Sequence, residues 1–251
     1  MQRIAKGEYR NTLAGFGIDA DLGVRSVGRL VLDLNEGHDN PAPNGQLATA
    51  LLAGACWSVL LVQLALDLDS YGQGIAATPL MLWRMAAYFT ILTNTLMATN
   101  LSLIVLGIDR GGKAWATAVA MYATLLMLLY QFVLGGTSGG QGWRLAVDIL
   151  HHYILPIAVL LHWVFWVPKV PHRLSDPVVW LAYPVIYFVY TLIRGHFTGR
   201  YPYDVLNVTR FGLPQVLANF SMLAVAYLLG GFAFVMLSRR MARIQAERLP
   251  A

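Results

Sequence analysis

Hydrophobic residues run along the chain in long stretches that contain few charges and are separated by short polar segments. Six of these stretches approach or exceed the length of about 20 apolar residues that a helix needs to cross a hydrocarbon core. In chain order they cover residues 47–66, 85–108, 114 to about 134, 145–167, 177–193 and 213–237. The pattern predicts an all-α polytopic membrane protein, with six transmembrane helices in one bundle over residues 47–238.

The composition supports lipid as the main solvent. Of the 251 residues, 57% are hydrophobic and 12% are charged, and this charged fraction is about half that of an ordinary soluble domain. A soluble enzyme, a disulfide scaffold and a disordered protein are therefore disfavoured. The single cysteine, Cys56, excludes an intrachain disulfide and a cysteine-based zinc or iron–sulfur site. Because the basic residues are spread among apolar runs, the net charge of +5 indicates anionic membrane surfaces and no nucleic acid.

The distribution of Lys and Arg predicts the orientation. With the N-terminus inside, 13 of the 18 basic residues fall on the cytoplasmic side, so the positive-inside rule places both termini in the cytoplasm. We expect the membrane to be a bacterial inner membrane. The five outer arginines oppose the rule, which suggests another role. Arg194 and Arg200 are predicted to bind an anionic group such as a carboxylate or lipid phosphate, with snorkelling to headgroups as the alternative.

Both ends of the chain differ from the hydrophobic centre. Residues 1–46 lack the apolar core of a secretory signal. Apolar residues recur at roughly helical spacing between positions 22 and 34, which predicts a short amphipathic helix on the inner membrane face or a partly disordered tail. A turn-rich linker is expected at residues 40–45. Residues 239–251 are predicted to form a basic cytoplasmic tail.

Polar side chains in the predicted spans gather at one depth. Thr90 lies six residues, and His152 eight residues, inward from the outer arginine of its span, which is roughly 9 and 12 Å at a rise of 1.5 Å per residue. Tyr187 in the fifth span and Asn219 in the sixth lie at a similar level. Polar groups inside a membrane are costly and often mark a site. The shared depth predicts a polar cavity in the outer half of the bundle.

Helical spacing selects the candidate catalytic groups. Asp148 precedes His151 by three residues and His152 by four, so its carboxylate shares a face with each imidazole. A hydroxyl near an imidazole that is held by a carboxylate can attack an ester. We therefore predict Thr90 as nucleophile, one of the two histidines as base and Asp148 as its partner. Asn94, or a tyrosine hydroxyl, is the expected donor to the oxyanion.

The remaining candidates are predicted to bind substrate. Tyr187, Tyr190 and Arg194 follow one another at helical spacing along the fifth span, and Asn94 and Asn219 complete this set. A tyrosine stripe is also typical of packing and interfacial anchoring, and a lone membrane threonine usually bonds its own backbone. No H-x-x-x-H or H-E-x-x-H spacing occurs, so no metal and no cofactor are predicted.

Three strings resemble one known family. They are Tyr-Phe-Thr-Ile-Leu-Thr-Asn at 88–94, Leu-His-His-Tyr-Ile-Leu-Pro at 150–156, and Arg-Gly-His-Phe at 194–197 with Tyr-Pro-Tyr-Asp at 201–204. Together they resemble the androgen-induced-gene family of six-span membrane proteins, in particular its bacterial Pr-six-Pr branch, over roughly residues 47–238. Animal members of that family are threonine hydrolases that cleave fatty acid esters of hydroxy fatty acids.

The resemblance implies specific roles. Thr90 matches the nucleophilic threonine of the family, and the essential histidine falls at His152 by the bacterial spacing or at His151 by the animal spacing. Leu92-Thr93 stands where a Gln-Ser pair is common, and His162-Trp163 stands where Asp-Trp is common. These departures bear on the substrate more than on the threonine–histidine pair.

The sequence thus predicts a membrane-embedded threonine hydrolase that cleaves an acyl ester of a lipid. Its partners would be membrane lipids and a lipid ester substrate that enters sideways from the membrane. Two alternatives use the same polar cavity or its polar groups: a non-catalytic binder or transporter of a small amphipathic molecule, and a membrane subunit of a larger complex.

Overall fold

The computed structural model describes residues 43–108, 112–136 and 141–247. Every regular element in these ranges is a helix, so the all-α prediction is confirmed for them. The amphipathic helix predicted between positions 22 and 34 lies outside the described residues. The first helix begins at Pro43, and the last three residues of the predicted linker therefore belong to it.

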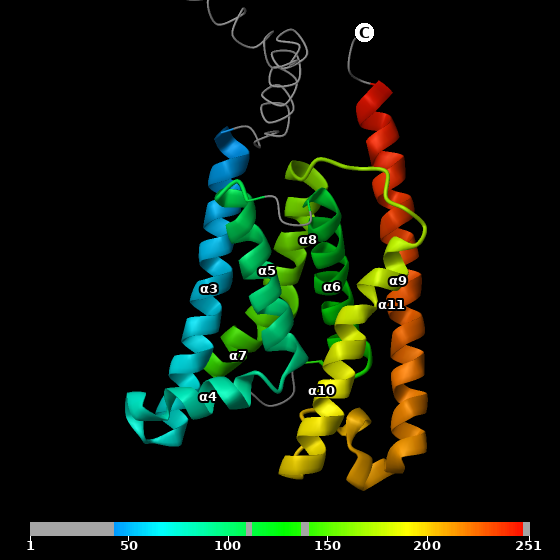
Figure 1. Ribbon diagram of the computed structural model, residues 1–251. Helices are drawn as coiled ribbons and strands as arrows, with labels where there is room; N and C mark the ends of the chain where they lie inside the picture. The colour runs from blue at the N-terminus through cyan, green and yellow to red at the C-terminus, as the bar shows by residue number, and fades with distance from the viewer. Residues whose placement is uncertain (1–42, 109–111, 137–140, 248–251) are drawn as a thin grey trace, which may run out of the picture. The chain divides into compact units, whose positions relative to one another are not determined.

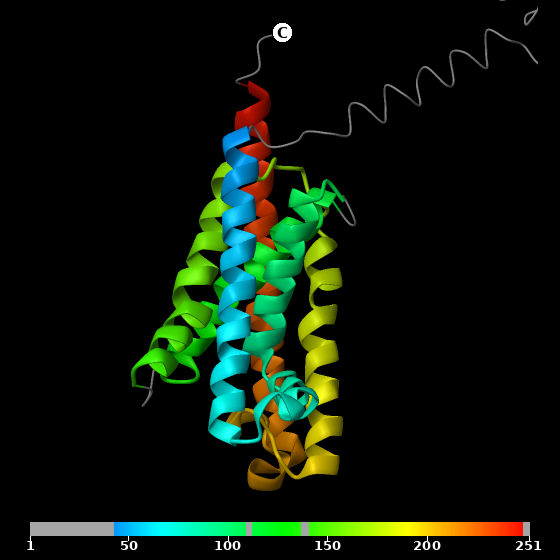
Figure 2. The same cartoon turned by 90° about the vertical axis from the view of Figure 1, so that its left-hand side faces the viewer.

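The long helices of the described residues pack side by side (Figures 1 and 2). α5 packs between α3 and α6, and α6 also packs against α8 and α11. The elements in chain order are α3 (Pro43–Tyr71), η1 (Gly74–Ala77), α4 (Thr78–Met85), α5 (Phe89–Val105), α6 (Gly112–Phe132), α7 (Trp143–Ile149), η2 (Leu150–Ile154), α8 (Leu155–Trp166), α9 (Asp176–Trp180), α10 (Ala182–Thr198), η3 (Asp204–Leu206) and α11 (Val208–Glu247).

Five helical segments of the described chain are long and apolar enough to cross a membrane. They correspond to the first, third, fourth, fifth and sixth predicted spans. The second prediction, a continuous helix over residues 85–108, is wrong at its start. There the chain forms two helices, α4 and α5, which meet at a bend of 100°, and α4 lies across the end of the bundle (Figure 1). The pair reaches spanning length and hydropathy only when its two members are taken together.

Side chains of α10 stabilise the break between α4 and α5. The Tyr187 hydroxyl donates to the Ala87 carbonyl at 2.7 Å, and the Arg194 guanidinium donates to the Trp83 carbonyl at 2.8 Å. Carbonyls at a helix end have no partner within their own helix and need one from elsewhere. Because these partners come from a helix about 100 residues later in the chain, the local sequence of the second span does not reveal the break.

The fourth span changes its helical geometry where the two histidines lie. α7 and α8 are joined by η2, a π-helical turn over Leu150–Ile154, in which the Leu155 N–H bonds the Leu150 carbonyl five residues earlier. Pro156 lies just after Leu155 and has no N–H to offer the carbonyl four residues before it. The proline therefore favours the wider turn, and such turns occur often at functional sites.

The loop between α10 and α11 is held firmly against both helices. A Cβ atom added to Gly195 would lie 2.1 Å from a ring atom of Tyr201, so only glycine allows the loop to pack this closely on α10. Asn219 of α11 donates from Nδ2 to the Val205 carbonyl at 2.8 Å. These contacts fix the position of Tyr203, which lies in the same loop.

α11 covers 40 residues and consists of two helical parts joined at a kink. It bends near its start, where Gly212 has a φ of 73° and Pro214 follows. It contains the whole sixth predicted span and continues through residues 239–247, so the described part of the predicted basic tail is helical.

Candidate active site

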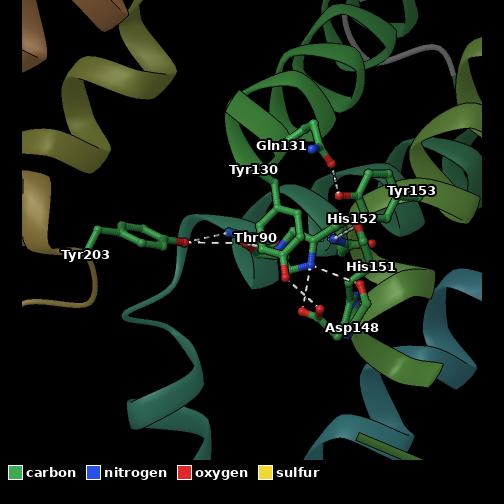
Figure 3. Close-up of polar contacts among 9 residues, drawn as sticks. Thr90, Tyr130, Gln131, Asp148, His151, His152, Tyr153 and Tyr203 are labelled. Carbon is green, nitrogen blue, oxygen red and sulfur yellow. Dashed lines mark hydrogen bonds and ion pairs between the residues drawn. The ribbon is translucent and has the colours of Figure 1, made fainter. Parts of the chain in front are cut away.

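A hydroxyl, an imidazole and a carboxylate form a hydrogen-bonded chain (Figure 3). Thr90 Oγ1 lies 3.0 Å from His152 Nε2. His152 Nδ1 lies 3.0 Å from Asp148 Oδ1 and 3.0 Å from the Asp148 carbonyl. Both oxygens only accept hydrogen bonds, so Nδ1 must carry the ring proton of the neutral imidazole. Nε2 is then free to accept the proton of the Thr90 hydroxyl.

Tyr130 of α6 completes this chain. Its hydroxyl donates to Asp148 Oδ2 at 2.6 Å, so each carboxylate oxygen of Asp148 has a hydrogen-bond partner. The Tyr130 ring stacks on the His152 ring, with centroids 3.5 Å apart and planes 12° apart. Tyr130 therefore holds both the carboxylate and the imidazole in place. Tyr130 could not be identified from the sequence, because no helical spacing connects a residue of α6 with one of α7.

The break between α4 and α5 places Thr90 at the start of a helix. Tyr88 is the N-cap of α5 and is extended, with φ of −93° and ψ of 126°. The first hydrogen bond of the new helix runs from the Leu92 N–H to the Tyr88 carbonyl. The Thr90 N–H is therefore not needed by the helix, and it points to the Tyr203 hydroxyl at 3.4 Å. Negative charge near Thr90 would be favoured by the helix dipole.

The predicted meeting of Thr90 with His152 is thus present, although the depth argument assumed a continuous second span. The distance of Thr90 from Arg84 along the chain includes the bend between α4 and α5. It is not a rise along one helix. What brings the two side chains together is the packing of the α5 start against the π-helical turn.

Asn94 and His151 are buried next to this chain. Asn94 donates from Nδ2 to the Thr90 carbonyl at 2.9 Å and to the His151 carbonyl at 3.3 Å. Both amide hydrogens are thus used to join α5 to η2, which leaves none for a substrate oxyanion. The ring nitrogens of His151 have no hydrogen-bond partner among the described residues. Of the two histidines, His152 is the one that contacts the threonine.

The side chains of α10 that were predicted to bind substrate make contacts within the protein instead. Tyr187 and Arg194 bond the backbone at the break, as described above, and the Tyr190 hydroxyl accepts a hydrogen bond from Arg194 at 2.9 Å. The Arg194 guanidinium also lies 4.2 Å above the ring centre of Trp83. Tyr190, Arg194 and Asn219 line neither of the two cavities described next.

Two cavities of opposite character meet at Thr90. The larger has a volume of about 580 Å³ and is lined by charged side chains of α3, α4 and α7 as well as by the two histidines. The smaller has a volume of about 80 Å³ and lies among apolar and aromatic side chains of α6, α10 and α11. The residues that line both are Thr90, Tyr130, Leu134 and Tyr203.

Of the two arginines that line the larger cavity, Arg84 is the one that remains available to bind an anionic ligand. Arg144 also lines this cavity, but it bonds the Leu66 carbonyl at 2.7 Å and the Ser70 hydroxyl, and it lies 3.7 Å from Asp67. Among the described residues, Arg84 has no ion pair and contacts the ring of Tyr71 at 5.8 Å. The same part of the chain contains no group of three His, Cys, Asp or Glu side chains that could hold a metal ion.

A second hydroxyl–imidazole–carboxylate group lies near the other end of α6. Thr117 Oγ1 is 3.0 Å from His172 Nε2, and His172 Nδ1 is 3.2 Å from Asp176 Oδ2. Burial lowers the pKa of His172. Trp163 donates to the same threonine at 3.0 Å, and none of these residues lines either cavity. This group joins α6, α8 and the segment that leads into α9. It differs from the Thr90 group in lining neither of the two cavities.

Comparison with models of known protein families, with curated proteins and with solved structures found no match to this chain. The family resemblance remains a prediction that rests on the three strings quoted above.

Proposed function

We propose that this protein is a membrane-embedded threonine hydrolase that cleaves an acyl ester of a lipid. One observation carries the proposal: the hydrogen-bonded chain of Thr90, His152 and Asp148 ends at a hydroxyl that faces two cavities of opposite polarity. The Thr117–His172–Asp176 group has the same side chains but lines neither cavity. A carrier would need the cavities, but it would have no use for such a group placed with its hydroxyl at both of them.

The reaction follows from the proton positions. His152 Nε2 accepts the hydroxyl proton while Thr90 Oγ1 attacks the carbonyl carbon of the ester. The alcohol then leaves and takes this proton from the imidazolium, which Asp148 stabilises at Nδ1. Water, activated by the same imidazole, hydrolyses the acyl-threonine and regenerates the hydroxyl. Tyr130 keeps Asp148 in position throughout.

The two cavities support an amphipathic substrate that is divided at the nucleophile. The first carbons of the acyl chain would occupy the small apolar cavity between α6, α10 and α11. The alcohol part would occupy the larger cavity, in which Arg84 offers a positive charge to an anionic group. In this proposal Arg84, and not Arg194 or Arg200, binds the anionic group of the substrate. The described contacts of Arg194 are with a backbone carbonyl, a hydroxyl and a ring.

A fluorophosphonate probe tests the proposed chemistry directly. We expect the purified protein to be labelled at Thr90, with labelling lost in Thr90→Val and strongly reduced in His152→Ala. Thr93→Val is the matched control, because Thr93 is also buried on α5 but its hydroxyl contacts the Tyr183 hydroxyl at 3.0 Å. Equal labelling of the Thr90→Val protein, or binding of lipid esters without any turnover, would favour the carrier alternative.

Arg84 is expected to select esters whose alcohol part is anionic. Hydrogen bonds to charged groups contribute about 1.5–3 kcal/mol, so Arg84→Gln should lower kcat/KM for such esters by roughly 10- to 100-fold. Neutral esters of the same length should react as before. Arg200→Gln serves as the control, because Arg200 is an arginine that lines neither cavity. Equal losses for anionic and neutral esters would contradict the assignment of Arg84.

We also propose that both termini are cytoplasmic, which places the loop after α10 outside. A cysteine at Thr198, in a Cys56→Ser background, should then react with an impermeant maleimide in intact cells. A cysteine at Arg243 should react only after permeabilisation. The reverse pattern would contradict the orientation and place the two cavities in the inner half of the membrane.

A further inference from the structure

The hydroxyl of Tyr203 touches Thr90 at two atoms. It lies 3.4 Å from the Thr90 amide nitrogen and 3.4 Å from Thr90 Oγ1. Figure 3 shows Tyr203 on one side of Thr90, and His152 with Tyr130 on the other side. The nucleophilic oxygen therefore has a proton acceptor on one side and a phenol on the other.

The Thr90 N–H determines the direction of the Tyr203 hydroxyl hydrogen. This amide donates to the Tyr203 oxygen, so the hydroxyl hydrogen of Tyr203 is directed elsewhere. If the Thr90 hydroxyl donates to His152, then Oγ1 accepts the hydrogen of Tyr203 in the resting state. Once Oγ1 has formed a bond to carbon, it is a weaker acceptor than the charged oxygen that develops beside it.

We propose that Tyr203 is a catalytic residue that donates its hydroxyl hydrogen bond to the oxyanion of the tetrahedral intermediate. The inference rests on the proposed hydrolase function. The Thr90 N–H, freed at the start of α5, is the second donor to this oxygen. The two donors lie next to each other before substrate binds, and the N–H exchanges the Tyr203 oxygen for the oxyanion when the intermediate forms.

The Oγ1–C bond forms as the hydroxyl proton passes to His152 Nε2, and the π electrons of the carbonyl move to its oxygen. That oxygen carries one negative charge and accepts the hydrogen bonds of the Tyr203 hydroxyl and the Thr90 N–H. When the carbonyl re-forms, the C–O bond to the alcohol breaks and the alcohol takes the proton from His152. Tyr203 keeps its own proton throughout.

Three features of the structure suit Tyr203 to this role. Burial raises the pKa of Tyr203, so the phenol remains a neutral donor over the range in which an imidazole base works. The side chain lines both cavities, so it lies where the ester carbonyl must be when acyl chain and alcohol occupy one cavity each. Its loop is anchored at Gly195 and Asn219, which limits the movement of the hydroxyl.

Tyr203→Phe is the decisive variant. Loss of one oxyanion donor typically lowers kcat by about 10²–10³-fold, and we expect a loss in this range with KM nearly unchanged. A trifluoromethyl ketone analogue of a lipid ester, which forms an oxyanion on attack by Thr90, should inhibit the variant more weakly by a similar factor. The corresponding amide, which binds without forming an oxyanion, should bind both proteins equally. Tyr201→Phe, in the same loop, controls for removal of a phenol hydroxyl near α10.

The possible outcomes separate this inference from the proposed function. Unchanged kcat in Tyr203→Phe, while Thr90→Val is inactive, overturns the role of Tyr203 and leaves the hydrolase intact. Equal weakening of the ketone and the amide also overturns it, because the residue would then support binding alone. If the unmodified protein neither turns over lipid esters nor reacts with the ketone at Thr90, the proposed function itself fails.

Discussion

Replacing Thr90 by valine is expected to abolish ester hydrolysis, with a fall in kcat of about 10⁴-fold or more. Valine retains the shape of threonine but has no oxygen to attack the carbonyl carbon. The change also removes the contacts of Oγ1 with His152 and Tyr203, and a buried polar group left without its partner costs about 1–3 kcal/mol. We therefore expect a small loss of thermal stability beside the loss of activity.

Thr90→Ser is the matched variant for this prediction. Serine keeps the nucleophilic oxygen but lacks the methyl group that limits rotation about χ1, so part of the activity should remain. Hydrolysis by both proteins is measured on a fluorogenic lipid ester in detergent, after folding has been checked by size-exclusion chromatography. Undiminished hydrolysis by folded Thr90→Val would show that another residue is the nucleophile.

Sequence reasoning reached the groups that share a helix. Asp148 and His152 are four residues apart, so helical periodicity placed them on one face, and the π-helical turn changes the path of the chain only after Ile149. Thr90 was selected because its predicted depth is similar to that of His152 and because it matches the threonine of the family that the three strings resemble. The all-α fold followed from the same apolar stretches.

The features that sequence reasoning missed depend on contacts between distant segments. The bend before α5 contains no proline or glycine that would have predicted it. Its carbonyls accept hydrogen bonds from Tyr187 and Arg194 of α10. Because of the same bend, Arg84 lines the larger cavity and Arg194 bonds the Trp83 carbonyl. Tyr130 and Tyr203 reach the site from α6 and from the loop before α11, and local periodicity cannot identify residues that meet only through packing.

The bend also connects fold with chemistry. A continuous second span would have hydrogen-bonded the Thr90 N–H within the helix and hidden it from a substrate. Because the chain breaks at residues 86–88, Thr90 instead lies in the first turn of α5, where its N–H and the positive end of the helix dipole face the reacting atoms. The cost of an interrupted span is offset by the α10 side chains that bond the exposed carbonyls.

His152→Ala is expected to lower kcat by a factor similar to that of Thr90→Val, because a threonine hydroxyl without its base is a poor nucleophile at neutral pH. The double variant should be hardly worse than either single variant, since residues that act as one unit are strongly non-additive. The rates of all four proteins on one lipid ester give the coupling between the two positions.

His151→Ala separates the base from its neighbour. His151 is more deeply buried than His152 but contacts no hydroxyl among the described residues. Its removal should therefore reduce stability while kcat remains within about tenfold of the original, well short of the loss expected for a missing triad base. If the two histidines exchange these effects, the base is His151 and the π-helical turn must rearrange when substrate binds. If the losses of Thr90→Val and His152→Ala instead multiply in the double variant, the two residues act independently, and the hydrogen bond of 3.0 Å between them supports the structure rather than the reaction.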